Sequence, residues 1–301
     1  RLDLGRKLFG GPAFIQDLVI PGMLHGRVVR APNRAGRIAN VDAAGFRQRF
    51  AQVQLLRDGS FLGILATREE VAVAAAAHLE TLVQWKLPPT LPDCADLKAF
   101  LTGTPCEERV VDQRVAPEAP PPGLTHFESW YQRPFIAHAS IGPSCALAQW
   151  KDDRLEIWSH SQGIFNLKAD IEVFLRREFA DSVVPEVVIH HVEGAGCYGH
   201  NPADDVAFDA ALLARHAKGL PVRVLWSRAA ELSVGPSGSA HLVRIEADLA
   251  DDGSIFNWKH TVWANGYTSR PGRAAPGKLA FVAAAELENA FETPVALDAL
   301  E

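Results

Sequence analysis

Apolar and polar positions along the first part of the chain predict a layer of strands and one helix. Residues 23–30 (MLHGRVVR) alternate apolar and polar side chains in the manner of a half-buried strand. Residues 61–66 (FLGILA) form a short apolar run, which is typical of a buried strand. Thr67 is then expected to be a helix N-cap, with Glu70 completing a capping box, and the alanine-rich helix is expected to run to about Trp85.

Proline then interrupts the regular pattern. Residues 88–92 (PPTLP) and 117–122 (PEAPPP) break any helix or central strand, and only a short helix near residues 93–101 is expected between them. Because an extended polyproline stretch behaves as a semi-rigid spacer, we predict that residues 88–122 are a proline-rich connector.

From Gly123 onward the pattern predicts more strands than helices, and therefore an α+β fold. Two hairpins are expected, each with a polar turn between its strands. The strands are expected at residues 145–150, 155–160, 186–192, 221–226, 241–250 and 255–264, and the helices at residues 163–179 and 202–218. Pro202 suits the first position of the second helix, and Gly219 suits the position just after its end.

Composition narrows the class of protein. The chain has 301 residues, 48% of them hydrophobic and 22% charged, as in ordinary globular proteins, and its length favours two domains. The formal net charge of −6 provides no overall basic field, so no nucleic-acid partner is expected. No apolar stretch approaches the roughly 20 residues of a membrane span, so none is expected.

Two further features concern the chain start and the cysteines. The chain begins at Arg1 and its one methionine is Met23, with no signal-peptide pattern before it, so we expect a processed chain or an excised piece. The four cysteines have irregular spacing and no CxxC pair, which favours buried reduced thiols over disulfides, a zinc ribbon or an iron–sulfur site. They are Cys94, Cys106, Cys145 and Cys197.

The most informative segment is residues 194–201 (GAGCYGHN), between a predicted strand and a predicted helix. Its glycines allow the backbone to approach a ligand closely and to offer N–H groups. The segment formally satisfies GxGxxG, but Asp204 and Asp205 fall in the first turn of the helix, where they would repel a pyrophosphate. The amides are therefore expected to face a carbonyl or metal-oxo oxygen, and the alternative is a tight turn that merely connects strand to helix.

Two other interpretations of the same region have less support. Cys197 and His200 could act as nucleophile and base, but no oxyanion or orienting groups accompany them. His190 and His191 could join Cys197 and His200 in a metal cluster, but neighbours on a strand point to opposite faces.

Taken together, several segments resemble a known family. They are residues 22–24 (GML), 30–32 (RAP), the HA pair at 138–139, SHSQ at 159–162, the glycine loop, and GLPVRVLWSRAAEL at 219–232. This order resembles the molybdopterin-binding large subunit of the xanthine dehydrogenase and aldehyde oxidase family, in particular its nicotinate dehydrogenase and isoquinoline 1-oxidoreductase branch. The resemblance implies an α/β-hammerhead domain (1–87), the connector (88–122) and the first molybdopterin-binding domain (123–301), the last of them expected to be incomplete.

The resemblance also implies site residues. Gln162 matches a glutamine whose amide hydrogen-bonds to an oxo ligand of molybdenum, with a surface glutamine as the alternative. Asn201 matches a position that orients substrate, where xanthine-oxidising members carry a glutamate, so purine oxidation is not favoured. The residues matching the loop around the pterin are Gly194, Gly196, Cys197, Tyr198, Gly199 and His200.

The chain also departs from the family pattern. Cys197 and Tyr198 replace the usual Phe–Gly pair, and Gly142 stands where many members have glutamate. His138, in the HA pair, is expected to be a core histidine with satisfied hydrogen bonds.

The activity that the resemblance implies is oxidative hydroxylation of an N-heterocycle or an aldehyde at molybdopterin-bound molybdenum, expected in its cytosine dinucleotide form. The expected partners are the C-terminal remainder of the subunit and an iron–sulfur electron-transfer subunit. The general-base glutamate of the family is expected outside this chain, so no catalytic residue is assigned, and the chain alone is expected to fold without catalysing. The alternative function is that of a non-catalytic scaffold or interaction module. The sequence does not decide between a cytoplasmic and a periplasmic location.

Overall fold

The computed structural model describes residues 2–89, 95–114, 119–266, 272 and 274–294. The chain divides into two compact units, each built from segments distant in the sequence. The large unit comprises Arg1–Thr90, Ala137–Pro236 and Ser269–Val295, and the small unit comprises Leu91–Ile136, Ser237–Thr268 and Ala296–Glu301. Strands and helices both contribute, so the predicted mixture of α and β structure is confirmed.

A seven-stranded sheet organises the large unit, in the order β3-β4-β1-β10-β7-β8-β9. Its strands are β1 (Leu24–Val29), β3 (Gln54–Asp58), β4 (Phe61–Ala66), β7 (Cys145–Lys151), β8 (Arg154–Ser159), β9 (Glu186–His191) and β10 (Val222–Leu225). β1 pairs in parallel with β10, so one sheet unites strands from the predicted first and third segments. The division into 1–87, 88–122 and 123–301 stays a prediction.

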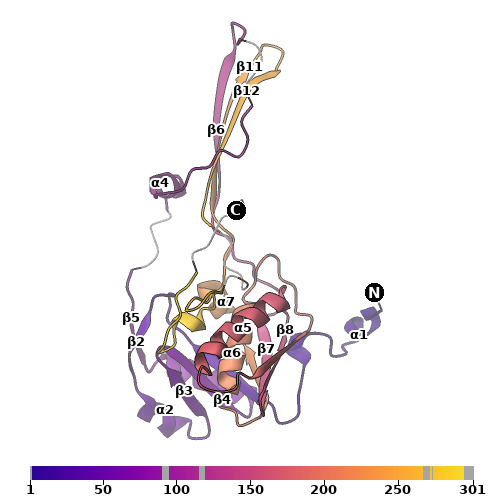
Figure 1. Ribbon diagram of the computed structural model, residues 1–301, viewed down its shortest axis with the longest axis vertical. Coiled ribbons are helices and arrows are strands. Elements are labelled where there is room, and N and C mark those ends of the chain that lie inside the picture. The colour runs from indigo at the N-terminus through magenta and orange to yellow at the C-terminus, as the bar shows by residue number, and fades with distance from the viewer. Residues whose placement is uncertain (1, 90–94, 115–118, 267–271, 273, 295–301) are drawn as a thin grey trace. The chain divides into compact units, whose positions relative to one another are not determined.

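Helices cover both faces of this sheet (Figure 1). The helices of the large unit are α1 (Leu4–Leu8), α2 (Ala43–Arg49), α3 (Glu69–Glu80), α5 (Ile164–Glu178), α6 (Ala203–Ala214) and α7 (Arg228–Val234), with 3-10 turns at Ile15–Asp17 and Ala283–Ala285. Every residue of α6 is buried, and this helix packs on β1, β4, β7, β8 and β10. A two-stranded sheet joins β2 (Arg37–Val41) to β5 (Val83–Lys86).

The apolar run of β4 is explained by burial on both faces. Phe61 and Leu65 belong to the core that contains α6, whereas Leu62 and Ile64 belong to the core beneath α3. Because successive side chains of a strand point to opposite faces, a strand between two helical layers must be apolar at every position. The prediction of a buried strand at 61–66 is therefore confirmed.

The predicted start and end of the following helix are wrong. α3 begins at Glu69 after Arg68, no side chain caps it, and Thr67 lies before the helix. The helix ends at Glu80, and Trp85 belongs to β5, which has alternating burial. Cross-strand pairing with β2 and packing of alternate side chains on the core outweigh the helical propensity of this stretch.

The predicted elements of the later part are confirmed, with small shifts of their ends. β7 and β8 form the first hairpin, and α5, β9 and β10 lie at their predicted positions. α6 begins at Ala203 and ends at Ala214. Pro202 therefore lies just before the first helical position, and Gly219 does not directly follow the helix end, so the predicted placements of both residues are wrong. Among the described residues, no helix has both the length and the apolar character needed to cross a membrane.

The small unit is a three-stranded antiparallel sheet with one helix. Its elements are α4 (Leu97–Gly103), β6 (Thr125–Arg133), β11 (His241–Leu249) and β12 (Ile255–Ala264), with strand order β12-β11-β6. β11 and β12 form the second predicted hairpin. Leu97 and Leu101 of α4 pack with Leu242, beside the stacked rings of Trp130 and Trp263. A short helix within the predicted connector is thus confirmed, although residues 93 and 94 lie outside the described residues.

The cysteines follow their prediction only in part. All three described cysteines are free of disulfides. Cys145 is buried as expected, Cys197 is partly buried, and the prediction of a buried thiol is wrong for Cys106, which is exposed. Cys94 lies outside the described residues.

Candidate functional site

The glycine loop, residues 194–201, connects the end of β9 to the start of α6, as predicted. Its backbone turns through left-handed conformations at Gly196 (φ +92°), Tyr198 (φ +55°) and Gly199 (φ +127°). A non-glycine residue in this region costs about 1–3 kcal/mol, so Tyr198 is held there by its surroundings. The residue is 63% exposed, and its ring lies near Gly196, where an added Cβ atom would be 2.8 Å from Cε2 of Tyr198.

Two histidines lie directly against the loop backbone. A Cβ atom added at Gly194 would lie 2.5 Å from Nδ1 of His160, and one added at Gly199 would lie 2.3 Å from Nδ1 of His138. Glycine at both positions permits this approach, which any side chain would prevent. Nδ1 of His138 also lies 3.2 Å from the carbonyl oxygen of Tyr198. His138 is only partly buried, so the prediction of a core histidine is wrong.

His160 is a neutral, buried support for the loop. It is 3% exposed, and its Nε2 accepts a hydrogen bond of 3.3 Å from the backbone N–H of Cys145. Burial lowers the pKa of His160 to about 4, despite the opposing effect of Asp204, so the ring is uncharged near neutral pH. The acceptor role of Nε2 agrees with this state.

Asn201 turns its side chain inward. It is 2% exposed, and its Nδ2 donates to the carbonyl oxygen of Gly196 at 3.2 Å and lies 3.5 Å from Nδ1 of His160. These contacts close the loop on itself. A contact with substrate, as implied by the resemblance, stays a prediction.

Asp204, in the first turn of α6, touches both the loop and the segment that precedes α5. Its Oδ1 accepts a short hydrogen bond from Oγ of Ser161, and its Oδ2 lies 3.3 Å from Nε2 of His200. Gln162 follows Ser161 directly and is exposed. The structure thus places His160 against the glycine loop and links Ser161 to the loop through Asp204.

The segment around Gly142 completes the surroundings of the loop. A Cβ atom at Gly142 would lie 2.9 Å from Cβ of Ala195. Arg228 of α7 donates to the carbonyl oxygen of Ile141 at 2.9 Å, and Glu231 accepts from the backbone N–H of Ser144 at 2.6 Å. The motifs that carried the resemblance after the connector therefore meet at one place in the fold.

The loop offers backbone N–H donors that no described residue accepts. Among the residues that the structure describes, these backbone N–H groups donate to no protein acceptor: Gly194, Ala195, Gly196, Tyr198, Gly199 and His200. Four of these residues (Gly194, Ala195, Gly196 and His200) are half-buried, whereas Tyr198 and Gly199 are exposed. Because half-buried amides are normally paired, unpaired ones at this place fit an oxygen-rich ligand. This donor set is compatible with the pterin and oxo groups that the resemblance implies.

The metal cluster that was considered as an alternative is not assembled among the described residues. Nε2 of His200 faces Asp204, and His190 stacks on Trp158 with its Nε2 3.2 Å from Glu156. Within the described ranges, the residues proposed as a metal cluster do not form a group with ligand atoms in reach of one another.

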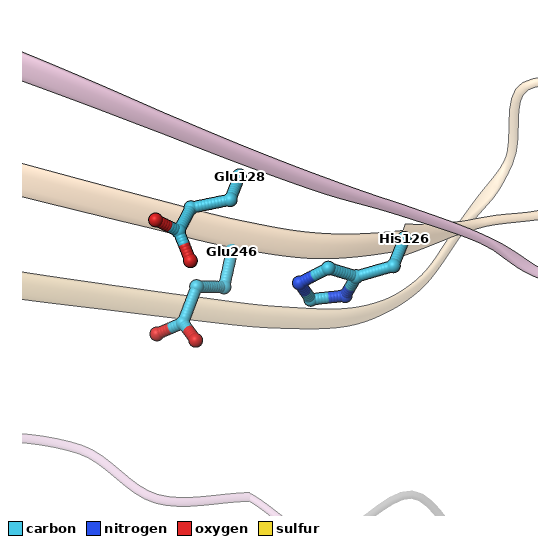
Figure 2. A group of neighbouring side chains, drawn as sticks. All are labelled: His126, Glu128 and Glu246. Carbon is cyan, nitrogen blue, oxygen red and sulfur yellow. The ribbon is translucent and has the colours of Figure 1, made fainter.

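One histidine–carboxylate group that the sequence analysis missed lies in the small unit (Figure 2). The ligand atoms of His126, Glu128 and Glu246 all lie within 4.8 Å of one another. Residues 126 and 128 share a face of β6, a signal that the alternation of a strand could have provided. Glu246 is already paired with Arg244 at 2.6 Å and lies 3.7 Å from Lys259, so ion pairing of the sheet accounts for this group.

Three carboxylates of α6 are buried, which the sequence analysis also missed. Asp204 and Asp205 lie in the first turn, as predicted, and Asp209 follows one turn later. Asp205 accepts from the backbone N–H of Val282 at 2.8 Å, and burial raises the pKa of its carboxyl. Each carboxylate has a hydrogen-bonded partner, as burial requires.

Comparisons with known proteins agree with this geometry. A family model described as "Molybdopterin cofactor-binding domain" matches residues 124–295, more than half of the chain. A subunit of the nicotinate dehydrogenase of Pseudomonas putida is 34% identical over 286 residues, covering 92% of this chain and 23% of that protein. The beta subunit of the isoquinoline 1-oxidoreductase of Brevundimonas diminuta is 24% identical over 290 residues, covering 90% of this chain and 35% of that protein.

The solved structures show the same fold. A Cu,Mo-CO dehydrogenase matches with a TM-score of 0.59 at 16% identity, over 87% of this chain and 39% of that one. The chain therefore spans about a quarter to a third of the length of the curated relatives. It has the fold of the corresponding part of a molybdenum enzyme. The assignment of a hammerhead domain stays a prediction. Because the family model matches more than half of the chain and includes the glycine loop, the chain belongs to the family of molybdopterin cofactor-binding domains.

Proposed function

We propose that this chain forms part of the molybdopterin site in the large subunit of a molybdenum hydroxylase, which oxidatively hydroxylates an N-heterocycle or an aldehyde. The observation that carries the proposal is the set of six loop amides, at residues 194–196 and 198–200, that donate to no described residue. Asp204 links this loop to the segment that bears Gln162. The family membership supports molybdopterin as the ligand of these donors.

The chain's own contribution is binding and preorganisation. Backbone N–H groups of the loop donate to ligand oxygens, and the amide of Gln162 adds a side-chain donor beside them. Donors fixed before the ligand arrives stabilise charge on oxygen without reorganisation during the reaction. The bound cofactor would supply the redox chemistry, and water would be the source of the oxygen atom. No residue of this chain is assigned as general base, and the catalytic glutamate is proposed to lie outside it.

The substrate class and the partners are proposals at the same level. The relatives carry the names of nicotinate and isoquinoline enzymes, which favours an aromatic N-heterocycle over an aldehyde. Their designation as subunits fits an assembly in which the remainder of the large subunit and an iron–sulfur electron-transfer subunit complete the enzyme. The cytosine dinucleotide form of the pterin belongs to the same proposal.

The test is metal and pterin analysis of the complete protein, followed by steady-state oxidation of nicotinate. We expect stoichiometric molybdenum in the wild type. Gln162→Ala is expected to lower turnover about 10–100-fold, as for the loss of one donor to a charged oxygen, while the fold survives. The matched control is Gln132→Ala, an exposed glutamine of the small unit, which should not change turnover. A folded, complete protein without molybdenum would instead favour the scaffold alternative.

A further inference from the structure

We propose that Asp204 is a positioning residue that fixes the segment bearing Gln162 and the glycine loop in a single arrangement. The side chain is 5% exposed and contacts both segments from the first turn of α6. Its Oδ1 accepts from Oγ of Ser161, and its Oδ2 lies 3.3 Å from Nε2 of His200. The inference rests on the proposed function in that these two segments form the pterin site.

A carboxylate is the side chain that this position requires. Oγ of Ser161 accepts the backbone N–H of Gly163 at 3.0 Å, so its own proton is directed to Asp204. Nε2 of His200 can serve as a second donor to the other oxygen of Asp204. An ionised carboxylate accepts from both donors, whereas an asparagine amide offers one acceptor and would turn N–H groups toward the other donor.

The opposite end of the loop is held by the residue before Ser161. The ring of His160 lies against Gly194, and Nδ1 of His160 lies 3.5 Å from Nδ2 of Asn201, which in turn donates to Gly196. The segment 160–161 therefore contacts the loop at its start through His160 and at its end through Asp204. Movement of one segment must displace the other.

This coupling matters for binding because the loop amides named above have no protein acceptors of their own among the described residues. Backbone hydrogen bonds to the described residues do not fix these six amides, so side-chain contacts of the loop help to set the direction of its donors. Asp204 then acts on the ligand through the loop and does not touch it. Sites that depend on preorganised donors are sensitive to such supports.

The experiment compares Asp204→Asn with Asp205→Asn in the complete protein. Asp205 is an adjacent buried carboxylate of the same helix turn, but it binds the backbone of Val282 and not the loop. The first readout needs no cofactor: the alkylation rate of Cys197, a partly buried thiol within the loop, divided by that of the exposed Cys106. The second readout is the rate at which the protein loses molybdenum. Circular dichroism checks that each variant is folded.

We expect Asp204→Asn to raise the alkylation ratio about tenfold or more and to accelerate molybdenum loss, with Asp205→Asn close to wild type. Ser161→Ala and His200→Ala, which each remove one donor to Asp204, should give intermediate ratios. Equal ratios for the two aspartate variants, whether raised or unchanged, would overturn the proposal. If the wild type holds no molybdenum but Asp204→Asn still raises the ratio, the coupling stands and the proposed function fails. The opposite result, molybdenum present and the ratio unchanged, rejects the coupling alone.

Discussion

The guanidinium of Arg30 pairs with the carboxylate of Asp209 in the interior of the large unit and joins the end of β1 to the middle of α6. The two side chains are 6% and 0% exposed. The indole N–H of Trp226 donates to the second oxygen of Asp209 at 2.8 Å, and its ring lies 4.9 Å from Arg30. Arg30 and Trp226 both belong to motifs that carried the family resemblance, and the structure gives these motifs a shared role in stability.

Removal of the carboxylate should therefore destabilise the fold strongly. Asp209→Ala leaves the buried charge of Arg30 without its main partner, and we expect a loss of about 3–5 kcal/mol in the free energy of unfolding. Thermal unfolding of the chain measures this loss. The exposed Asp181→Ala provides the matched control and should stay within about 0.5 kcal/mol of wild type. A small effect of Asp209→Ala would show that Arg30 finds other compensation.

Loss of the negative charge of Glu286 should stabilise the fold near neutral pH, in contrast to the loss of the Asp209 carboxylate. Its Oε2 lies 3.5 Å from Nε of Arg30, but one arginine cannot compensate two buried carboxylates, and burial raises the pKa of Glu286 to about 7. The folded state then binds a proton that the unfolded state has released. This contribution to the free energy of unfolding is fully present below pH 4.5 and is lost as pH rises through 7. The total loss is at most about 3 kcal/mol.

Glu286→Gln imitates the protonated form and should remove this dependence. We expect a melting temperature equal to wild type at about pH 4.5 and higher than wild type at about pH 8. A variant that is less stable than wild type at the higher pH would show that the carboxylate is ionised and paired with Arg30.

His160 predicts a dependence of opposite sign. Burial lowers its pKa to about 4, so the unfolded state binds a proton before the folded state does. The contribution is present above pH 6.5 and is lost as pH falls through 4, with an upper limit of about 3 kcal/mol. His160→Gln should flatten the acid limb of a plot of melting temperature against pH, after normalisation to the value near neutral pH. The same acid limb in both proteins would assign the loss to other groups.

The local sequence pattern predicted the strands, helices and loop that carry the site. The end of α3 and the burial of two carboxylates depend instead on packing between segments distant in the sequence. The β7–β8 hairpin and the glycine loop could be predicted because alternation, a polar turn and glycine content are visible within a few residues. The end of α3 could not, because β5 forms through pairing with β2. The burial of Asp204 and Asp209 was equally invisible, since a carboxylate in a helix is normally solvated unless a distant donor such as Ser161 or Arg30 meets it.

The close approach of His160 to the loop makes Gly194 sensitive to substitution. An alanine methyl would lie 2.5 Å from Nδ1 of His160, a buried ring that cannot move without losing its bond from Cys145. Gly194→Ala should therefore displace the loop at a cost of about 1–3 kcal/mol and lower the molybdenum content of the complete protein several-fold. Gly5→Ala, where nothing lies within 4 Å of the added carbon, is the control and should retain the metal. Full molybdenum in Gly194→Ala would show that the direction of the loop amides does not decide cofactor binding, and that the close contact with His160 serves stability alone.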